Sequence, residues 1–193
     1  FSASLLAGES LMIYSDENHS SLDYVLGNKN LGSDHKQVFY NWLKVSSLTF
    51  SSIDNLRITL TSKTVSGNKE NLVYHPKTIS VGVGCERGTN KEELISLVGS
   101  TLKKNKISHE SVAAVVSIDL KSDEPAIHAL SENLTDKTGK SCPARFFDAV
   151  ELEEQAPKLQ NPSLIVFKEV GCHGVAEGAA LAASGKTGKL VIP

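Results

Sequence analysis

The chain has 193 residues, of which 40% are hydrophobic and 22% charged, and its formal net charge is −2. These values are typical of a globular protein, the charge does not indicate a nucleic-acid partner, and no apolar run approaches the roughly 20 residues that span a membrane. We therefore expect one large domain or two small ones in the cytoplasm, with neither nucleic acid nor a membrane as a partner.

The three cysteines, Cys85, Cys142 and Cys172, are spread along the chain. An odd number without close pairing does not indicate a disulfide framework, and reduced thiols fit a cytoplasmic protein. The chain begins with Phe1 rather than methionine, and no charged leader of a signal peptide follows it. We expect it to be part of a longer protein.

Residues 1–77 predict a small α/β domain. Short apolar or alternating runs indicate strands at 11–14, 57–61 and 71–74. Polar residues over 15–34 indicate a loop, and the spacing of the apolar residues that follow predicts a short amphipathic helix from about His35. Pro76 stops the last of these strands, so we place the domain boundary between residues 77 and 78.

Residues 78–193 alternate strand and helix signals more regularly. Apolar runs predict strands over 79–83, 112–118, 142–147 and 190–192. Start signals between them predict helices that open at about Asn90, Pro125, Asn161 and Val175. The nearly continuous apolar run 112–118 is typical of a strand covered on both faces. We therefore predict a three-layer α/β/α domain with a largely parallel or mixed sheet, preceded by the smaller α/β domain.

Two of the helix starts carry the pattern of a capping box, in which a cap residue stands three positions before a glutamate. These are Thr89 with Glu92 and Asp148 with Glu151. We expect a capping box at Thr89 and an acidic cap at Asp148.

The stretch 79–89 predicts a strand followed by a glycine-rich turn, with Cys85 and Arg87 at the carboxyl end of the strand. Ligands of open α/β sheets bind at that edge. The glycines follow the pattern G-x-G-x-x-x-G rather than the dinucleotide pattern G-x-G-x-x-G, and Asp119 lies further from Gly88 than the roughly 20 residues usual for the acidic residue of that motif. A nucleotide-binding domain is therefore a weak alternative.

Three stretches, 81–89, 117–125 and 161–180, together resemble the carboxyl-terminal domain of the cobalamin-biosynthesis proteins of the CbiG/CobE family, in the same order and at similar spacing. The resemblance covers about residues 78–193. Residues 1–77 resemble the middle region of CbiG more loosely, chiefly where 5–8 lead into the first strand, and this region favours CbiG over the shorter CobE.

The resemblance implies a role in the anaerobic assembly of the corrin ring. It implies hydrolysis of cobalt-precorrin-5A, in which the δ-lactone on ring A opens and a two-carbon unit leaves as acetaldehyde. The corrinoid intermediate is then the partner, and other enzymes of the pathway and a second copy of the chain are further candidates. Cobalt would arrive within the substrate, so that neither a metal site of the protein nor an organic cofactor is implied.

Lactone opening needs a base for water and donors for the developing oxyanion. Asp119 and Glu124 are the candidate catalytic carboxylates, from one loop at a strand end. The backbone N–H groups of the turn 84–89 could form an anion-binding nest, and basic side chains could hold the carboxylate arms of a corrinoid. The candidate substrate-binding residues are Gly84, Cys85, Arg87, Gly88, Thr89, Lys121, Asp123 and Glu177.

Each of these residues also has an ordinary structural interpretation. Asp123 could cap the next helix, Asp119 could bond to loop amides, and Glu177 could complement a helix dipole. Arg87 could pair with Glu86 or Glu92 on the surface.

Cys85 could act as a nucleophile because it precedes a helix, but no histidine is locally placed to activate it. A metal site of Cys85, Cys172 and His173 has no typical ligand spacing. For the whole chain, a corrinoid carrier that passes intermediates between enzymes without chemistry remains the alternative to the hydrolase.

Overall fold

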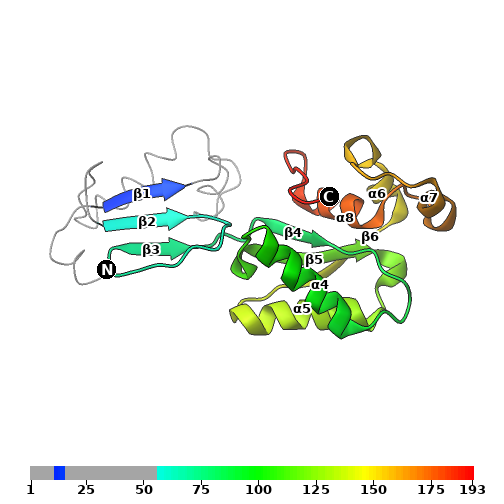
Figure 1. Ribbon diagram of the computed structural model, residues 1–193. Helices are drawn as coiled ribbons and strands as arrows, with labels where there is room; N and C mark the ends of the chain where they lie inside the picture. Colours follow the sequence, from blue (N-terminus) through cyan, green and yellow to red (C-terminus); the bar gives the residue numbers. More distant parts are fainter. Residues whose placement is uncertain (1–10, 16–55) are drawn as a thin grey trace. The chain divides into compact units, whose positions relative to one another are not determined.

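The computed structural model describes residues 11–15 and 56–193 (Figure 1). The chain divides into two compact units, Phe1–Pro76 and Lys77–Pro193. This division lies one residue before the boundary expected from the sequence. That the first unit corresponds to the middle region of CbiG stays a prediction.

The first unit contains a parallel sheet of three strands in the order β1-β2-β3. They are β1 (Leu11–Ser15), β2 (Leu56–Leu60) and β3 (Asn71–Tyr74), and the three predicted strands are therefore confirmed. The side chain of Asn68 accepts hydrogen bonds from the backbone N–H groups of Glu70 and Asn71 at 2.9 and 2.8 Å, which forms the turn before β3. The loop and helix predicted over 16–55 lie outside the described residues.

The second unit is built on a second parallel sheet, in the order β4-β5-β6. Its strands are β4 (Ile79–Gly82), β5 (Val112–Ile118) and β6 (Ala144–Phe147). Its helices are α4 (Lys91–Lys104), α5 (Pro125–Thr138), α6 (Ala149–Glu153), α7 (Leu164–Val170) and α8 (Val175–Ser184). Short 3₁₀ turns lie at His109–Ser111, Asp119–Lys121 and Ala156–Lys158.

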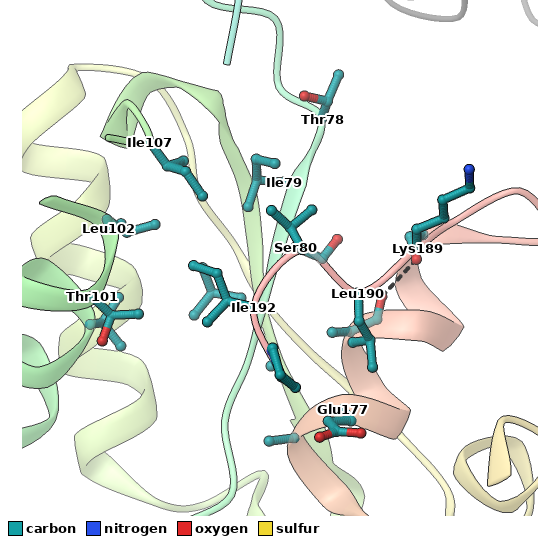
Figure 2. Close-up of a pocket in the computed structure, with 18 of the residues that line it drawn as sticks. Thr78, Ile79, Ser80, Thr101, Leu102, Ile107, Glu177, Lys189, Leu190 and Ile192 are labelled. Carbon is teal, nitrogen blue, oxygen red and sulfur yellow. Dashed lines mark hydrogen bonds between the residues drawn. The ribbon is translucent and has the colours of Figure 1, made fainter. Parts of the chain in front are cut away.

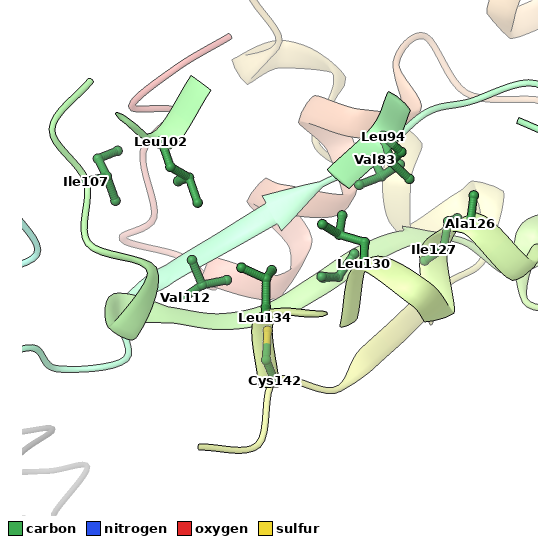
Figure 3. Packing of buried hydrophobic residues seen from close by; sticks show 11 residues of the cluster. Val83, Leu94, Leu102, Ile107, Val112, Ala126, Ile127, Leu130, Leu134 and Cys142 are labelled. Atoms are coloured by element: carbon green, nitrogen blue, oxygen red, sulfur yellow. The ribbon is translucent and has the colours of Figure 1, made fainter. Parts of the chain in front are cut away.

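The central strand β5 has a core on each of its faces, because its side chains alternate between them after an irregularity in its pairing with β4 near Val112. Val112 and Val115 pack with residues of α4 and α5, among them Leu102 and Leu130 (Figure 3). The other face of β5 packs with α6 and α8 through Ala114, Val116, Ile118, Leu152 and Ala179. The helices therefore cover both faces of the sheet (Figure 1), and the predicted three-layer α/β/α fold is confirmed.

Several local predictions for this unit are confirmed. Pro125 begins α5, and Asp148 with Glu151 forms the predicted capping box of α6. Ser163 caps α7, directly after the Asn-Pro pair that indicated a helix start, and Gly185 ends α8. These signals act within one turn of the chain, and for this reason the sequence alone reveals them.

Two local predictions are wrong. Asn90 rather than Thr89 caps α4, because the Asn90 side chain accepts the Glu93 N–H at 2.9 Å whereas the Thr89 hydroxyl donates to the Glu86 carbonyl at 2.7 Å. The expected strand at 190–192 is absent from the described fold. Its apolar signal has another cause, since Ile192 packs against the core between α4 and the sheet without entering a strand ladder.

Candidate active site at the carboxyl edge of the second sheet

Because β4, β5 and β6 are parallel, the segments that follow them begin at one edge of the sheet. These are the turn 83–90, the turn 119–124 and helix α6. The first turn is anchored to β5, since the Val83 N–H donates to the Val116 carbonyl at 2.8 Å. The buried Ser117 hydroxyl in turn donates to the Val83 carbonyl at 2.7 Å. Both turns therefore leave the sheet from fixed positions.

Arg87 joins the two turns. Its guanidinium donates to both carboxylate oxygens of Asp123, at 2.9 and 3.1 Å, and to the Leu120 carbonyl at 2.8 Å. The pKa of the Asp123 carboxyl lies below its ordinary value, chiefly because of the hydrogen bond from Arg87. The Arg87 and Asp123 side chains are 61% and 70% exposed, so the pair contributes little to stability but fixes the turns relative to each other. Asp123 is thus an ion-pair partner and not the expected helix cap.

Glu124 holds the turn 83–90 by a hydrogen bond from inside the protein. Its side chain is buried, with 2% exposure, and Oε2 accepts the Gly88 N–H at 3.1 Å. Gly88 has a φ of +73°, a conformation that favours glycine. The other oxygen, Oε1, is buried and has no hydrogen-bond partner among the described residues. A carboxylate so enclosed can hold the turn in place, but a bulky ligand outside the turn cannot reach it.

The remaining residues of the turn 119–124 are more accessible than Glu124. Asp119 is exposed at the first position of the 3₁₀ turn, and Lys121 is half-buried in the same turn. In the described part of the chain, the Asp119 carboxylate accepts no hydrogen bond. Of the two carboxylates predicted as catalytic, Asp119 is therefore the one that faces solvent at the sheet edge.

The glycines of the first turn have different roles. A Cβ atom on Gly82 would lie 1.9 Å from the Ala176 carbonyl oxygen of α8, so this glycine allows α8 to pack directly on β4. A Cβ atom on Gly84 would be 3.6 Å from Val175 and 3.7 Å from the Ala176 backbone nitrogen, which are ordinary contacts. Gly84 is exposed, and the start of α8 lies beside it. Gly82 thus serves packing, which further weakens the nucleotide alternative.

Cys85 and Glu177 are turned toward the protein. Cys85 packs against the core between α4 and the sheet. Glu177, in the first turn of α8, accepts the backbone N–H of Gln160 at 2.6 Å and the amide of Asn161 at 2.6 Å. Burial raises the pKa of the Glu177 carboxyl, but these hydrogen bonds outweigh it and the pKa lies below its ordinary value. Glu177 therefore ties the loop at 160–161 to α8.

Sequence reasoning missed a pair of titratable residues next to this edge. Glu153, at the end of α6, accepts both the backbone N–H and the imidazole Nδ1 of His173, at 2.9 and 2.8 Å. The pKa of the Glu153 carboxyl lies below its ordinary value, chiefly because the carboxylate accepts the hydrogen bond from the His173 backbone N–H. The two residues are separated by 20 positions, so no local motif could have indicated the pair.

A separate cavity of about 340 Å³ lies along β4, between α4 and α8 (Figure 2). Most of its lining is apolar, including Ile79, Leu102 and Ile107, and the segment 189–193 closes one side. Of the predicted site residues only Glu177 lines it. The cavity therefore does not coincide with the polar edge formed by Arg87 and Asp119.

The cysteines provide neither a metal site nor an evident nucleophile. Among residues 11–15 and 56–193, no group of three or more His, Cys, Asp or Glu side chains could hold a metal ion. Cys142 and Cys172 are 1% and 0% exposed. Burial raises the pKa of both thiols, which keeps them protonated and unreactive.

We expect a thiol reagent added to the folded protein to modify Cys85 before the other two cysteines. Cys85 is half-buried, whereas reagents reach Cys142 and Cys172 only after local unfolding. Mass spectrometry of peptides after brief treatment at pH 7.5 measures the order. A Cys85→Ala variant, which should remain largely unmodified, is the control, and early labelling of Cys172 would contradict the packing described here.

Comparison with known proteins identifies the family of the chain. Residues 79–193 match the family described as Cobalamin synthesis G C-terminus, and the match covers more than half of the chain. The chain belongs to this family. In the described residues of this family member, no helix is long and apolar enough to cross a membrane.

Two curated relatives each match part of the chain. Protein CobE of Sinorhizobium sp is 42% identical over 112 residues, which are 58% of this chain and 69% of that protein. The cobalt-precorrin-5A hydrolase of Priestia megaterium is 35% identical over 115 residues, which are 59% of this chain but 28% of the enzyme. A crystal structure of CobE, a protein of the cobalamin pathway, matches with 36% identity and a TM-score of 0.50, over 56% of this chain and 72% of that one.

Proposed function

We propose that this member of the cobalamin-biosynthesis family hydrolyses cobalt-precorrin-5A, opening the lactone of ring A and releasing acetaldehyde. The relative from Priestia megaterium carries the name of this activity. The observation that carries the proposal is the meeting of three segments at one sheet edge: the turn 84–89, the turn 119–124 and the start of α8. A macrocycle bearing carboxylate arms suits such an open edge better than an enclosed pocket.

The residues divide into those that hold the edge and those that act on the ligand. Asp119, exposed at the sheet edge, takes the proton of the attacking water. Lys121 and the exposed backbone of Gly84 contact the carboxylate arms of the macrocycle. Arg87, Asp123 and Glu124 keep the two turns together. Cobalt belongs to the substrate, and no cofactor of the protein enters the reaction.

A second candidate function is a corrinoid carrier, which binds the intermediate and passes it on without chemistry. It is favoured by the relation to CobE, which is more similar to this chain than the hydrolase is and is matched over a larger share of its length. Both functions use the same sheet edge. They differ in whether Asp119 activates water or only borders the ligand.

The deciding experiment incubates the full-length protein with the lactone form of cobalt-precorrin-5A and measures acetaldehyde with alcohol dehydrogenase and NADH. The hydrolase of Priestia megaterium serves as the positive control. Release of acetaldehyde at a rate proportional to the protein concentration supports the hydrolase. Tight binding of the intermediate, seen as a shift in its absorption spectrum, without acetaldehyde would contradict the hydrolase and favour the carrier.

A further inference from the structure

We propose that His173, oriented by Glu153, is the general acid that protonates the departing alkoxy oxygen of the lactone when the lactone opens. This proposal rests on the hydrolase function proposed above. It gives the site a second proton-transfer group besides Asp119. His173 would be the catalytic residue and Glu153 its positioning residue.

Glu153 and Phe167 hold His173 in place. Its Nδ1 lies 2.8 and 3.0 Å from the two carboxylate oxygens of Glu153. The same carboxylate accepts the His173 backbone N–H at 2.9 Å. The ring stacks on Phe167 of α7, with the ring centroids 4.4 Å apart and an angle of 26° between the planes. Because a carboxylate only accepts hydrogen bonds, Nδ1 carries a proton, and Nε2 is left to give or take one.

The position of His173 suits this role. It directly precedes Gly174, the N-cap of α8, and the first residues of α8 lie beside Gly84, two residues after the end of β4. Glu153 ends α6, the helix that follows β6 at the same edge of the sheet. In Figure 1 the arrowheads of β4 and β5 point toward the side of the unit where α7 lies. The His173 side chain is 27% exposed, so that a ligand at this edge can reach it.

The other described histidines differ in this respect. The Nε2 atom of His128 lies 2.7 Å from the Ser122 carbonyl and is therefore engaged. His75 uses Nδ1 to contact the Thr61 carbonyl in the first unit. His109 lies in the 3₁₀ turn that precedes β5, and its Nε2 atom is buried. Burial lowers the pKa of its imidazole. Within residues 56–193, only His173 has one ring nitrogen held by a carboxylate.

The proposed step balances as an ester hydrolysis. The oxygen of a water molecule bonds to the acyl carbon of the lactone while Asp119 takes a proton from that water. The bond between the acyl carbon and the alkoxy oxygen of the lactone breaks, and this oxygen receives the Nε2 proton of the His173 imidazolium. The hydroxyl so formed is carried by the two-carbon unit. When the carbon–carbon bond between that unit and the macrocycle breaks, the hydroxyl proton is released, acetaldehyde departs and the electron pair of the broken bond stays on the macrocycle. Asp119 then releases its proton and the imidazole takes one up from solvent. Water is added across the ester, and nothing is oxidised or reduced.

The test measures acetaldehyde release by the full-length protein and by three variants, His173→Gln, Glu153→Gln and Glu110→Gln, between pH 5.5 and 9. We expect His173→Gln to lower kcat by about 10²- to 10⁴-fold, with little change in KM, and to abolish the decline of kcat at high pH. Glu153→Gln should lower kcat less than His173→Gln does, and it should shift the pH at which kcat declines. Glu110 pairs with Lys140 before β5, so Glu110→Gln is a matched control that should leave kcat unchanged.

Two further measurements separate catalysis from a structural role. Added imidazole should restore part of the activity of a His173→Ala variant, because it replaces the proton donor but not the packing. Nitrogen NMR of labelled histidine should show the Nδ1–H tautomer of His173 in the parent protein and its loss in Glu153→Gln.

The outcomes are distinguishable. An active parent protein with an equally active His173→Gln variant, or with an unchanged pH profile, would overturn the role of His173 and leave the hydrolase intact. A parent protein that binds the intermediate without turnover, while the Priestia enzyme is active, would remove the hydrolase function and the general acid together. Unfolding of His173→Gln, checked by circular dichroism, leaves the pH profile of Glu153→Gln to decide.

Discussion

Replacing Gly82 by alanine is expected to destabilise the protein by about 2–3 kcal/mol, which corresponds to a fall in melting temperature of roughly 10 °C. The added Cβ atom would lie 1.9 Å from the Ala176 carbonyl oxygen and 2.7 Å from its carbonyl carbon. Both are backbone atoms inside the first turns of α8, so no side-chain rotation relieves the overlap. The helix must instead move away from β4.

Gly84→Ala is the matched control for stability, because it lies two residues away in the same stretch and its Cβ atom meets only ordinary contacts at 3.6 Å and beyond. Thermal unfolding of both variants, followed by circular dichroism, measures the difference. We expect the melting temperature of Gly84→Ala to stay close to that of the parent. Equal melting temperatures for the two variants would mean that α8 does not pack on β4 as closely as described.

Replacing Asp119 by asparagine is expected to lower acetaldehyde release by about 10²- to 10⁴-fold, the range usual for loss of a general base. The amide keeps the size of the side chain but cannot take a proton from water. Asp119 is exposed and makes no described side-chain hydrogen bond, so stability should change by less than about 0.5 kcal/mol. The variant should still bind the intermediate, which distinguishes a lost base from a lost binding contact.

Asp136→Asn is the control for this substitution. Asp136 is exposed near the end of α5, far along the helix from its start at Pro125 beside the turn 119–124. We expect it to retain the parental rate. Full activity of Asp119→Asn would remove this residue from the mechanism, and an equal loss in both variants would point to a general effect of charge.

Much of the second unit could be predicted because the signals are local. The apolar run Val112–Ile118 forms β5 at the predicted bounds. The proline at 125 and the pair Asp148–Glu151 mark helix starts correctly. The exception at Asn90 is also local, since two neighbouring residues could each cap α4 and the Thr89 hydroxyl bonds within the preceding turn. Choosing between them requires the backbone path of that turn.

The candidate site could be predicted only as a set of segments. Parallel strands bring the loops after β4 and β5 to one edge, and the sequence was sufficient to indicate both loops. The roles inside them depend on contacts between residues 20 to 36 positions apart: Arg87 with Asp123, Gly88 with Glu124, and Glu153 with His173. These contacts separate exposed Asp119 from buried Glu124, two carboxylates that look alike in the sequence.

By itself, then, the sequence determined the layered fold of the second unit and its family, and it predicted the sheet edge that we propose as the ligand site. Periodicity, helix caps and the short motifs act over a few residues and do not need the folded chain to be recognised. Only the tertiary structure decided that Gly82 serves packing, that Arg87 and Glu124 hold turns together, and that His173 has an oriented imidazole. Burial and hydrogen-bond partners arise when distant segments meet, and no local pattern encodes them.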